Sequence, residues 1–127
     1  MQVGDTFTMQ RMLTQEDFNS FARLSGDDNP IHVDPDFSAR TRFGKTVAHG
    51  MFLYGLVSAL LASSVPGAEP ISQDLMFPAP SFAGDQVTIT LRVTAIDETK
   101  GTAEIETKVT RPGGEEGCQG HAWVKLP

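Results

Sequence analysis

The chain contains a single cysteine, Cys118, among its 127 residues. One cysteine forms no intramolecular disulfide and no cysteine-based metal site. This composition suits a reducing compartment, so we expect a cytoplasmic protein. The first ten residues also lack a basic segment followed by an apolar one, and no signal peptide is predicted.

Positive charge is scarce as well. Ten Lys and Arg residues stand against sixteen Asp and Glu, which gives a formal net charge of -6. Nucleic-acid binders hold the phosphate backbone with Lys and Arg, so an acidic chain without a basic run is a poor candidate for that class. An anionic ligand would have to be bound by a local group of basic residues.

Long apolar runs are absent except for one, Val47–Ala62. This run is shorter than the roughly 18 apolar residues of a membrane span and contains His49 and Ser58, so we expect no membrane insertion. A helix that is apolar on all sides is expected to be surrounded by the rest of the protein. Pro66 and Gly67 are predicted to end it.

A first helix is predicted after Thr14. Thr14 has the form of an N-cap, Glu16 and Asp17 place acids in the first turn, and Ser25-Gly26 ends the helix.

The segment after this helix is expected to be irregular at first. Asn29 precedes Pro30 and is biased out of the helical region, so Asp27 to His32 should form a loop. A short helix is predicted from Pro35 to about Arg42, ended by Gly44.

The C-terminal half alternates between apolar and polar residues, the pattern of half-buried strands. Strands are predicted, with a weaker first one, at Asp5–Leu13, Ser72–Phe77, Val87–Val93, 103–109 and Gly117–Leu126. Strands joined by short turns form an antiparallel meander, and the sheet must curve to cover one apolar helix. We expect one α+β domain over residues 1–127, a curved antiparallel β-sheet wrapped around a long central α-helix.

The polar turn Gly26–His32 carries a carboxylate and an imidazole, Asp27 and His32, five residues apart. Either residue alone in a loop is usually a turn or capping residue. Together, beside the start of a buried helix, they are typical of general acid–base catalysis.

This turn is followed by Asp34-Pro35 and then by Val47-Ala48-His49-Gly50-Met51. In this order the segments resemble the MaoC-like (R)-specific enoyl-CoA hydratases. Phe77-x-x-Pro80 and Gly84-Asp85 match the same family, and the similarity extends from about Asp17 to the C-terminus. The resemblance implies a hot-dog fold, usually dimeric, that hydrates trans-2-enoyl-CoA to (R)-3-hydroxyacyl-CoA.

The resemblance also implies residue roles. Asp27 and His32 would be the catalytic pair that holds one water. Helix physics adds Gly50, in the first turn of the central helix, where its backbone N–H would serve as an oxyanion hole and the missing Cβ would let a thioester oxygen approach. Asn29 lies near this site but is expected to fix the loop through hydrogen bonds to the backbone. His49 is interpreted as a packed or capping residue.

Contacts to the rest of the substrate are also predicted. Arg40, Arg42 and Lys45 place three positive charges within six residues and are candidates for the phosphates of coenzyme A, with a solvated face as the alternative. Ser58 is a candidate for the acyl pocket, unless its hydroxyl bonds back to the helix. The three histidines show no metal-binding spacing, so we expect no metal and no cofactor beyond the coenzyme A of the substrate.

Other activities remain open at this stage. The same residues would serve a dehydratase of (R)-3-hydroxyacyl thioesters, on coenzyme A or acyl carrier protein. A thioesterase would need a carboxylate on or beside the central helix, and Met51–Gly67 contains no acid. A non-catalytic acyl-CoA binding module would not need both Asp27 and His32. Acyl chain length and branching stay open too. So does the pathway, which could be fatty-acid metabolism, polyester precursor supply or the turnover of a specialised branched substrate.

A homodimer is expected because a sheet around one helix has edge strands, and pairing two edges removes them.

Overall fold

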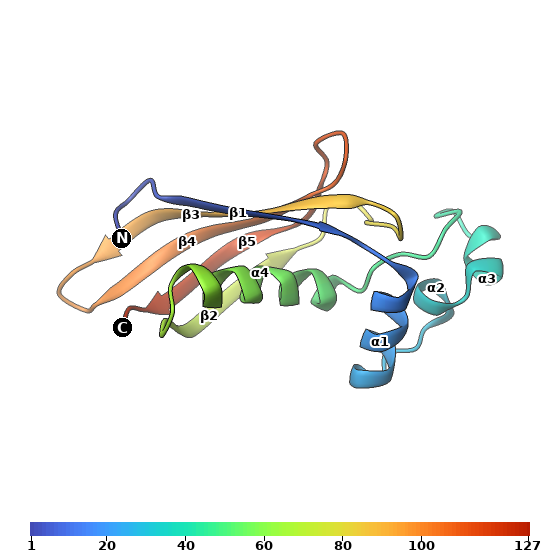
Figure 1. Cartoon of the computed structure of the whole chain (residues 1–127), viewed down its shortest axis with the longest axis horizontal. Helices are drawn as coiled ribbons and strands as arrows, with labels where there is room; N and C mark the ends of the chain where they lie inside the picture. The colour runs from blue at the N-terminus through green and yellow to red at the C-terminus, as the bar shows by residue number, and fades with distance from the viewer.

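A computed structural model describes all 127 residues of the chain. Its elements are β1 (Thr6–Met12), α1 (Gln15–Ser25), α2 (Pro30–Val33), α3 (Pro35–Ala39), α4 (Gly50–Ser64), β2 (Glu69–Met76), β3 (Gln86–Asp97), β4 (Thr102–Thr110) and β5 (Glu116–Lys125). The five strands form one antiparallel sheet in the order β1-β3-β4-β5-β2 (Figure 1). The predicted α+β architecture is therefore confirmed.

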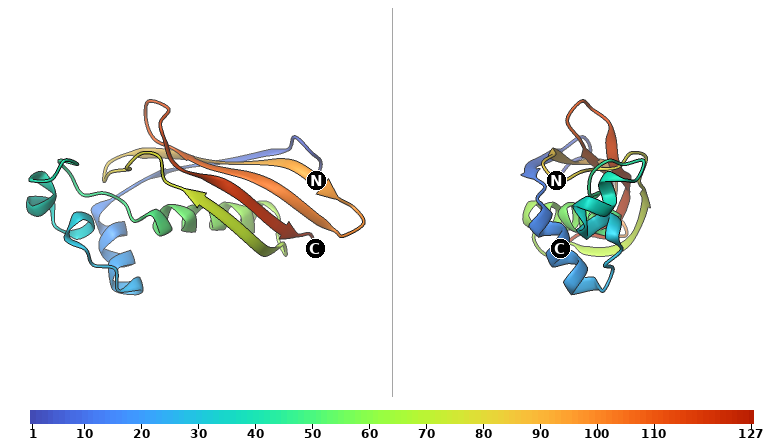
Figure 2. Two further views of the ribbon diagram at one scale, coloured as in Figure 1. Left: turned by 180° about the vertical axis from the view of Figure 1, so that it is seen from behind. Right: turned by 90° about the vertical axis from the view of Figure 1, so that its right-hand side faces the viewer.

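The core lies between the sheet and α4. Alternate residues of β3 are fully buried, from Val87 to Val93, and they belong to one cluster of 17 buried apolar residues that includes Leu53 and Leu60 of α4. The sheet curves around this helix (Figure 2). None of the helices is both long and apolar enough to cross a membrane.

One side of α4 is open to solvent in the single chain. Its buried residues are Leu53, Leu56, Val57, Leu60 and Leu61, and its exposed residues include Met51, Gly55, Ser58, Ala59 and Ala62. The expectation that the chain surrounds this helix is therefore wrong. The physical reason is that one curved sheet covers only the side of the helix that faces it.

The N-terminal helix begins as predicted. Thr14 and Asp17 form a reciprocal capping box, and Gly26 at φ 82° ends α1 in the left-handed conformation.

The next segment differs from the prediction in two places. Residues Pro30–Val33, expected in part as irregular loop, form a helical turn because Asn29 accepts a hydrogen bond from the backbone N–H of Ile31. Helix α3 ends at Ala39 instead of Arg42, since Arg40 and Thr41 donate to carbonyls only three residues back.

Candidate active site

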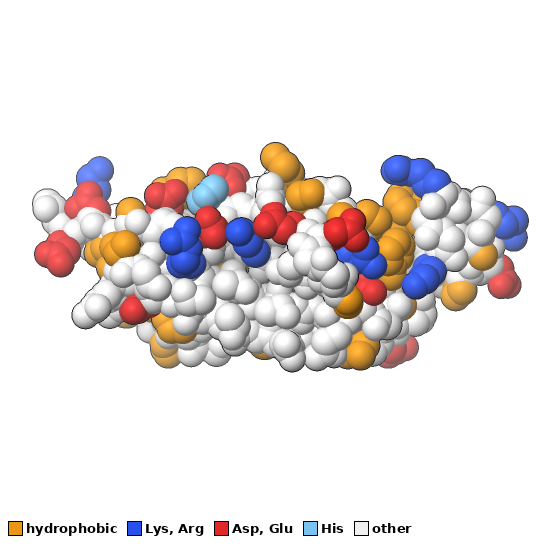
Figure 3. Space-filling view, turned by 90° about the horizontal axis from the view of Figure 1, so that it is seen from above, with side chains coloured by type: hydrophobic (Ala, Val, Ile, Leu, Met, Phe, Trp, Pro, Cys, Tyr) orange, Lys and Arg blue, Asp and Glu red, His pale blue; other side chains and the backbone are white.

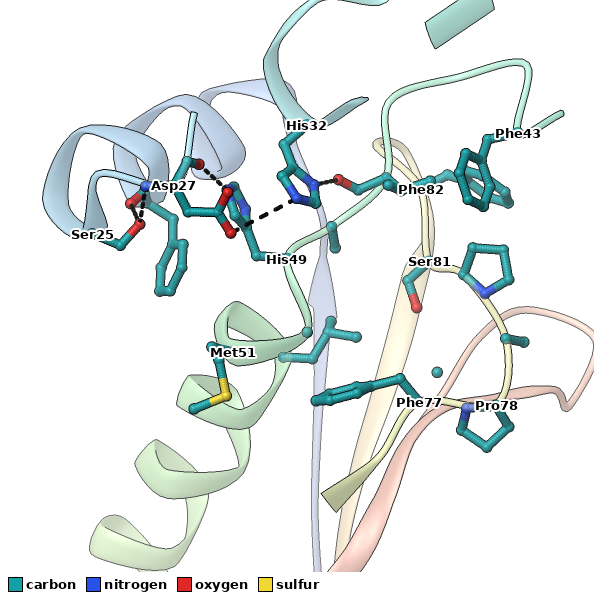
Figure 4. A pocket seen from close by; sticks show the side chains of 18 of the residues that line it. Ser25, Asp27, His32, Phe43, His49, Met51, Phe77, Pro78, Ser81 and Phe82 are labelled. Carbon is teal, nitrogen blue, oxygen red and sulfur yellow. Dashed lines mark hydrogen bonds and ion pairs between the residues drawn. The ribbon is translucent and has the colours of Figure 1, made fainter. Parts of the chain in front are cut away.

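A cavity of about 960 Å³ opens at the N-terminal end of α4. Its walls come from the loop after α1, from α2, from the start of α4 and from the loop between β2 and β3 (Figure 4). The polar and aromatic side chains on these walls include Asp27, His32, His49, Phe77 and Ser81. A concave site of this size fits a small-molecule ligand.

Asp27 follows directly on the end of α1. The turn at Gly26 redirects the chain, and the backbone N–H of Asp27 donates to the hydroxyl of Ser25 at 3.1 Å. The carboxylate stays 57% exposed and faces the ring of His32 (Figure 4). The carboxylate thus sits on a fixed backbone but remains reachable by solvent or ligand.

His32 is buried on α2, and its tautomer follows from its partner. Its Nδ1 lies 2.7 Å from the carbonyl oxygen of Val47, which can only accept, so Nδ1 carries the proton. Neutral His32 then presents a bare Nε2, and this atom lies 4.0 Å from Oδ2 of Asp27. That separation is too long for a direct hydrogen bond and leaves both atoms available to one shared water.

Gly50 is the first residue of α4, and its backbone N–H has no acceptor in the chain. The preceding residue, His49, makes no side-chain capping bond. An unpaired N–H at the positive end of a helix dipole favours negative charge. A Cβ at Gly50 would lie 2.7 Å from two ring carbons of Phe77, so this ring gives a second reason for glycine that the sequence did not indicate.

The interpretation of His49 as a packed or capping residue is confirmed by its packing. His49 occupies the N-cap position of α4, but its side chain makes no capping hydrogen bond. The side chain is buried, and its ring stacks on the ring of His32 with centroids 3.8 Å apart. The pKa of His49 is lowered, and burial is the main cause.

Asp27, His32 and His49 bring potential metal-ligand atoms within 4.8 Å of one another. The lone pairs of two stacked imidazoles lie in the two ring planes, here inclined by only 24°, whereas ligands of one ion converge on it. The absence of a metal stays a prediction.

The remaining predicted residues lie at different places. Asn29 fixes the local backbone by accepting a hydrogen bond from Ile31 N–H, as expected, and is not on the cavity wall. Ser58 is on the exposed side of α4, outside the cavity. Arg42 lines the cavity, whereas Arg40 and Lys45 lie outside it.

The loop between β2 and β3 supplies a wall that sequence reasoning missed. Phe77 and Ser81 come from this loop, and the Ser81 carbonyl accepts a hydrogen bond from Ala48 N–H at 2.8 Å. An ion pair between Asp85 and Arg111, at 3.1 Å, fixes the end of the loop against the turn that follows β4. In the sequence, only the motif Phe77-x-x-Pro80 points to this wall, and it indicates no role for Phe77 or Ser81.

Comparison with known proteins decides the family. The family model described as MaoC like domain matches residues 2–113. The chain belongs to the MaoC-like family. Relatives include the (R)-specific enoyl-CoA hydratase of Aeromonas caviae, 40% identical over 129 residues, with 100% of this chain and 96% of the relative covered. The 3-hydroxybutyryl-CoA dehydratase of Methylorubrum extorquens is 37% identical, with 100% of this chain and 82% of that relative covered.

Solved MaoC-like structures share the fold. The (R)-hydratase from A. caviae superposes with a TM-score of 0.97 at 39% identity and covers 100% of this chain and 98% of its own. An R-hydratase from Pseudomonas aeruginosa gives a TM-score of 0.95 at 31% identity, with 100% and 83% covered. The hot-dog fold implied by the sequence is therefore confirmed.

Proposed function

We propose that this MaoC-like chain hydrates trans-2-enoyl-CoA to (R)-3-hydroxyacyl-CoA. The observation that carries the proposal is the pair of proton acceptors on the cavity wall, the carboxylate of Asp27 and the bare Nε2 of His32, 4.0 Å apart. Full-length similarity to proteins named (R)-specific enoyl-CoA hydratase supports the same reaction and its stereochemistry.

In the proposed reaction a single water donates one hydrogen bond to Asp27 and its second hydrogen bond to His32. The water oxygen attacks C3 while its proton passes to Nε2 of His32, and the π electrons of the C2–C3 double bond move to the thioester oxygen. The imidazolium is stabilised by the Val47 carbonyl at Nδ1 and by the Asp27 carboxylate. It then returns the proton to C2. General acid–base assistance of this kind contributes roughly 10²–10⁴-fold.

The thioester oxygen gains enolate charge during this step. The Gly50 N–H, unpaired at the N-terminus of α4, is the proposed donor to it. A donor of this type is worth about 3–4 kcal/mol in the transition state.

The coenzyme A phosphates are proposed to bind near Arg42, with Arg40 and Lys45 beside it. Basic side chains gather at the end of the molecule that carries α3 (Figure 3). No ion pair of the chain engages any of the three. Their charges are therefore available to a phosphate. No other cofactor takes part in the proposed reaction.

The reverse reaction is the second candidate. The same two groups remove a proton from C2 and return it to the leaving hydroxyl, and one relative is named 3-hydroxybutyryl-CoA dehydratase. A thioesterase is disfavoured because Gly50–Ser64 contains no carboxylate to activate water. A cytoplasmic role in fatty-acid metabolism stays a prediction.

A second copy of the chain is the proposed partner. Strand β2 is an open edge of the sheet on which Ile71 and Met76 are each 60% exposed. The open side of α4 is uncharged, because the helix contains no Asp, Glu, Lys or Arg. Pairing of two copies along β2 would cover both the open strand edge and the uncharged, open side of α4.

Sedimentation tests the homodimer. The wild type should be dimeric at micromolar concentration, and Ile71→Lys with Met76→Lys should make it monomeric. Leu24→Lys, at an exposed apolar residue on α1, should leave the dimer intact. A monomeric wild type would refute the proposal.

The hydratase activity is tested with crotonyl-CoA and trans-2-octenoyl-CoA. Loss of the enoyl thioester absorbance measures hydration, and chiral analysis identifies the alcohol. The expected product is the (R)-3-hydroxyacyl-CoA. An (S)-product, or no turnover of any enoyl-CoA or enoyl carrier-protein thioester, would overturn the proposal.

A further inference from the structure

His49 stands between the two groups that the proposed reaction uses. It directly precedes Gly50, is only 2% exposed, and makes close contact with both Asp27 and His32. Figure 4 shows its ring beneath Asp27 and beside the ring of His32. No step of the reaction above assigns it a role.

The first contact is a hydrogen bond that fixes the tautomer of His49. Its Nε2 lies 2.8 Å from the backbone carbonyl oxygen of Asp27. A carbonyl oxygen only accepts, so Nε2 carries the proton and Nδ1 is bare. Nδ1 is buried and has no hydrogen-bond partner. A neutral ring held by one donated bond tolerates this environment, whereas a second buried N–H at Nδ1 would be left unpaired.

The second contact is the stack on His32. The two ring planes are inclined by 24° with centroids 3.8 Å apart, and Phe21 packs against His49 with centroids 4.7 Å apart. These contacts fix the plane of His32, and with it the direction of the bare Nε2 toward Asp27. The hydrogen bond to the Val47 carbonyl holds Nδ1, and the stack adds a second constraint on the ring plane.

The charge state of His49 agrees with these contacts. Burial lowers its pKa most, the nearby His32 lowers it further, and the hydrogen bond to Asp27 and the charge of that residue oppose the shift. The titratable groups that face it are therefore His32 on α2 and Asp27 on the loop after α1. A neutral His49 leaves room for a positive charge on His32, whereas a protonated one would repel it.

We propose that His49 is a positioning residue that sets the geometry of both catalytic groups at once. It holds the backbone of Asp27 through Nε2–H and the ring plane of His32 through stacking. The inference rests on the proposed hydratase function. It also explains why a polar side chain is buried at the N-cap position of α4 without a capping hydrogen bond.

Substitutions that keep one contact each separate the two roles. His49→Phe keeps an aromatic ring but loses the donor, His49→Gln keeps a donor but loses the stack, and His49→Ala loses both. Misplacement of a catalytic group by about 1 Å can cost about 10²-fold in rate. We expect kcat to fall about 10-fold in the Phe and Gln variants and about 100-fold in the Ala variant, with KM changed less than about threefold.

His121→Gln is the matched control because this histidine lies on β5, outside the cavity. Its kcat should equal that of the wild type. Urea denaturation of each variant shows that the assays use folded enzyme. Two-bond ¹H–¹⁵N spectra of the histidine rings give a readout besides activity, and they should show wild-type His49 as the neutral Nε2–H tautomer at neutral pH.

The outcomes separate this inference from the proposed function. An active wild type with an equally active, folded His49→Ala variant would overturn the positioning role alone. A cationic or Nδ1-protonated His49 at neutral pH would also overturn it. A rise in KM at unchanged kcat would show a binding role instead. A wild type without hydratase or dehydratase activity would refute the proposed function, and the positioning role with it.

Discussion

Replacement of Gly50 by Ala tests whether the start of α4 is an oxyanion hole. Gly50 is not among the glycines with positive φ, so alanine fits its backbone. At such a site Gly→Ala stabilises a protein by about 0.4–1 kcal/mol through the unfolded chain. The new Cβ, however, would lie 2.7 Å from Cε1 and Cζ of Phe77, and this ring must move.

The two effects on stability nearly cancel. Overpacking costs about 1–3 kcal/mol, and the low end applies because Phe77 is 46% exposed and lies in a loop. The net loss in unfolding free energy should therefore be below about 1 kcal/mol. Alanine keeps the backbone N–H, but its Cβ would keep the thioester oxygen away from it. Loss of this oxyanion contact, by contrast, lowers kcat about 10²–10³-fold. The predicted defect is therefore catalytic.

Phe77→Leu separates the clash from the chemistry. We expect Gly50→Ala in the Phe77→Leu background to regain stability in urea denaturation while its kcat with crotonyl-CoA stays low. If the double variant instead recovers the kcat of Phe77→Leu alone, glycine is required only to accommodate the ring. A single Gly50→Ala variant with wild-type kcat would refute the oxyanion assignment directly.

Three further predictions concern the surroundings of the site. Arg42→Gln should raise KM for enoyl-CoA about two- to fivefold in steady-state kinetics, which corresponds to the free energy of an exposed charge pair. The control Arg92→Gln, on β3, should leave KM unchanged. Asp85→Asn should lower the unfolding free energy, measured by urea denaturation, by about 1.5–3 kcal/mol, because Asp85 pairs with largely buried Arg111 and accepts a hydrogen bond from Phe82 N–H. The control Glu115→Gln, at an exposed partner of Arg111, should change it by less than about 1 kcal/mol. The pKa of His49 is lower in the folded state than its ordinary value of 6.5, so the unfolded state binds a proton first as the pH falls. The unfolding free energy should therefore decrease as the pH drops below 6.5, and His49→Gln should make this decrease smaller.

The strands and the long helices could be predicted because their patterns are local. Alternation in Val87–Val93 reflects burial of one sheet face, and Thr14 with Asp17 marks a helix start by itself. The Asp27 and His32 pair could be found because both residues lie in one turn of the sequence. The short helix α2 was missed because its capping by Asn29 depends on geometry that spacing alone does not give.

The rest of the cavity required contacts between distant segments. Phe77 meets Gly50 from a loop 27 residues further along the chain, and nothing in the local pattern of either residue predicts that contact. The stack of His49 on His32 has the same origin. The open side of α4 was missed for another reason: an apolar sequence shows that a surface will be covered, but not whether the cover comes from the same chain.

The central claim is that Asp27 and His32 act on one shared water. The most direct measurement is kcat/KM for crotonyl-CoA in wild type, Asp27→Asn, His32→Gln and the double variant. Each single substitution should lower kcat/KM by about 10²–10⁴-fold. The kcat/KM of the double variant should lie within about threefold of that of the less active single variant, because both groups serve one step. Losses that multiply in the double variant, or wild-type activity after either single substitution, would contradict the account.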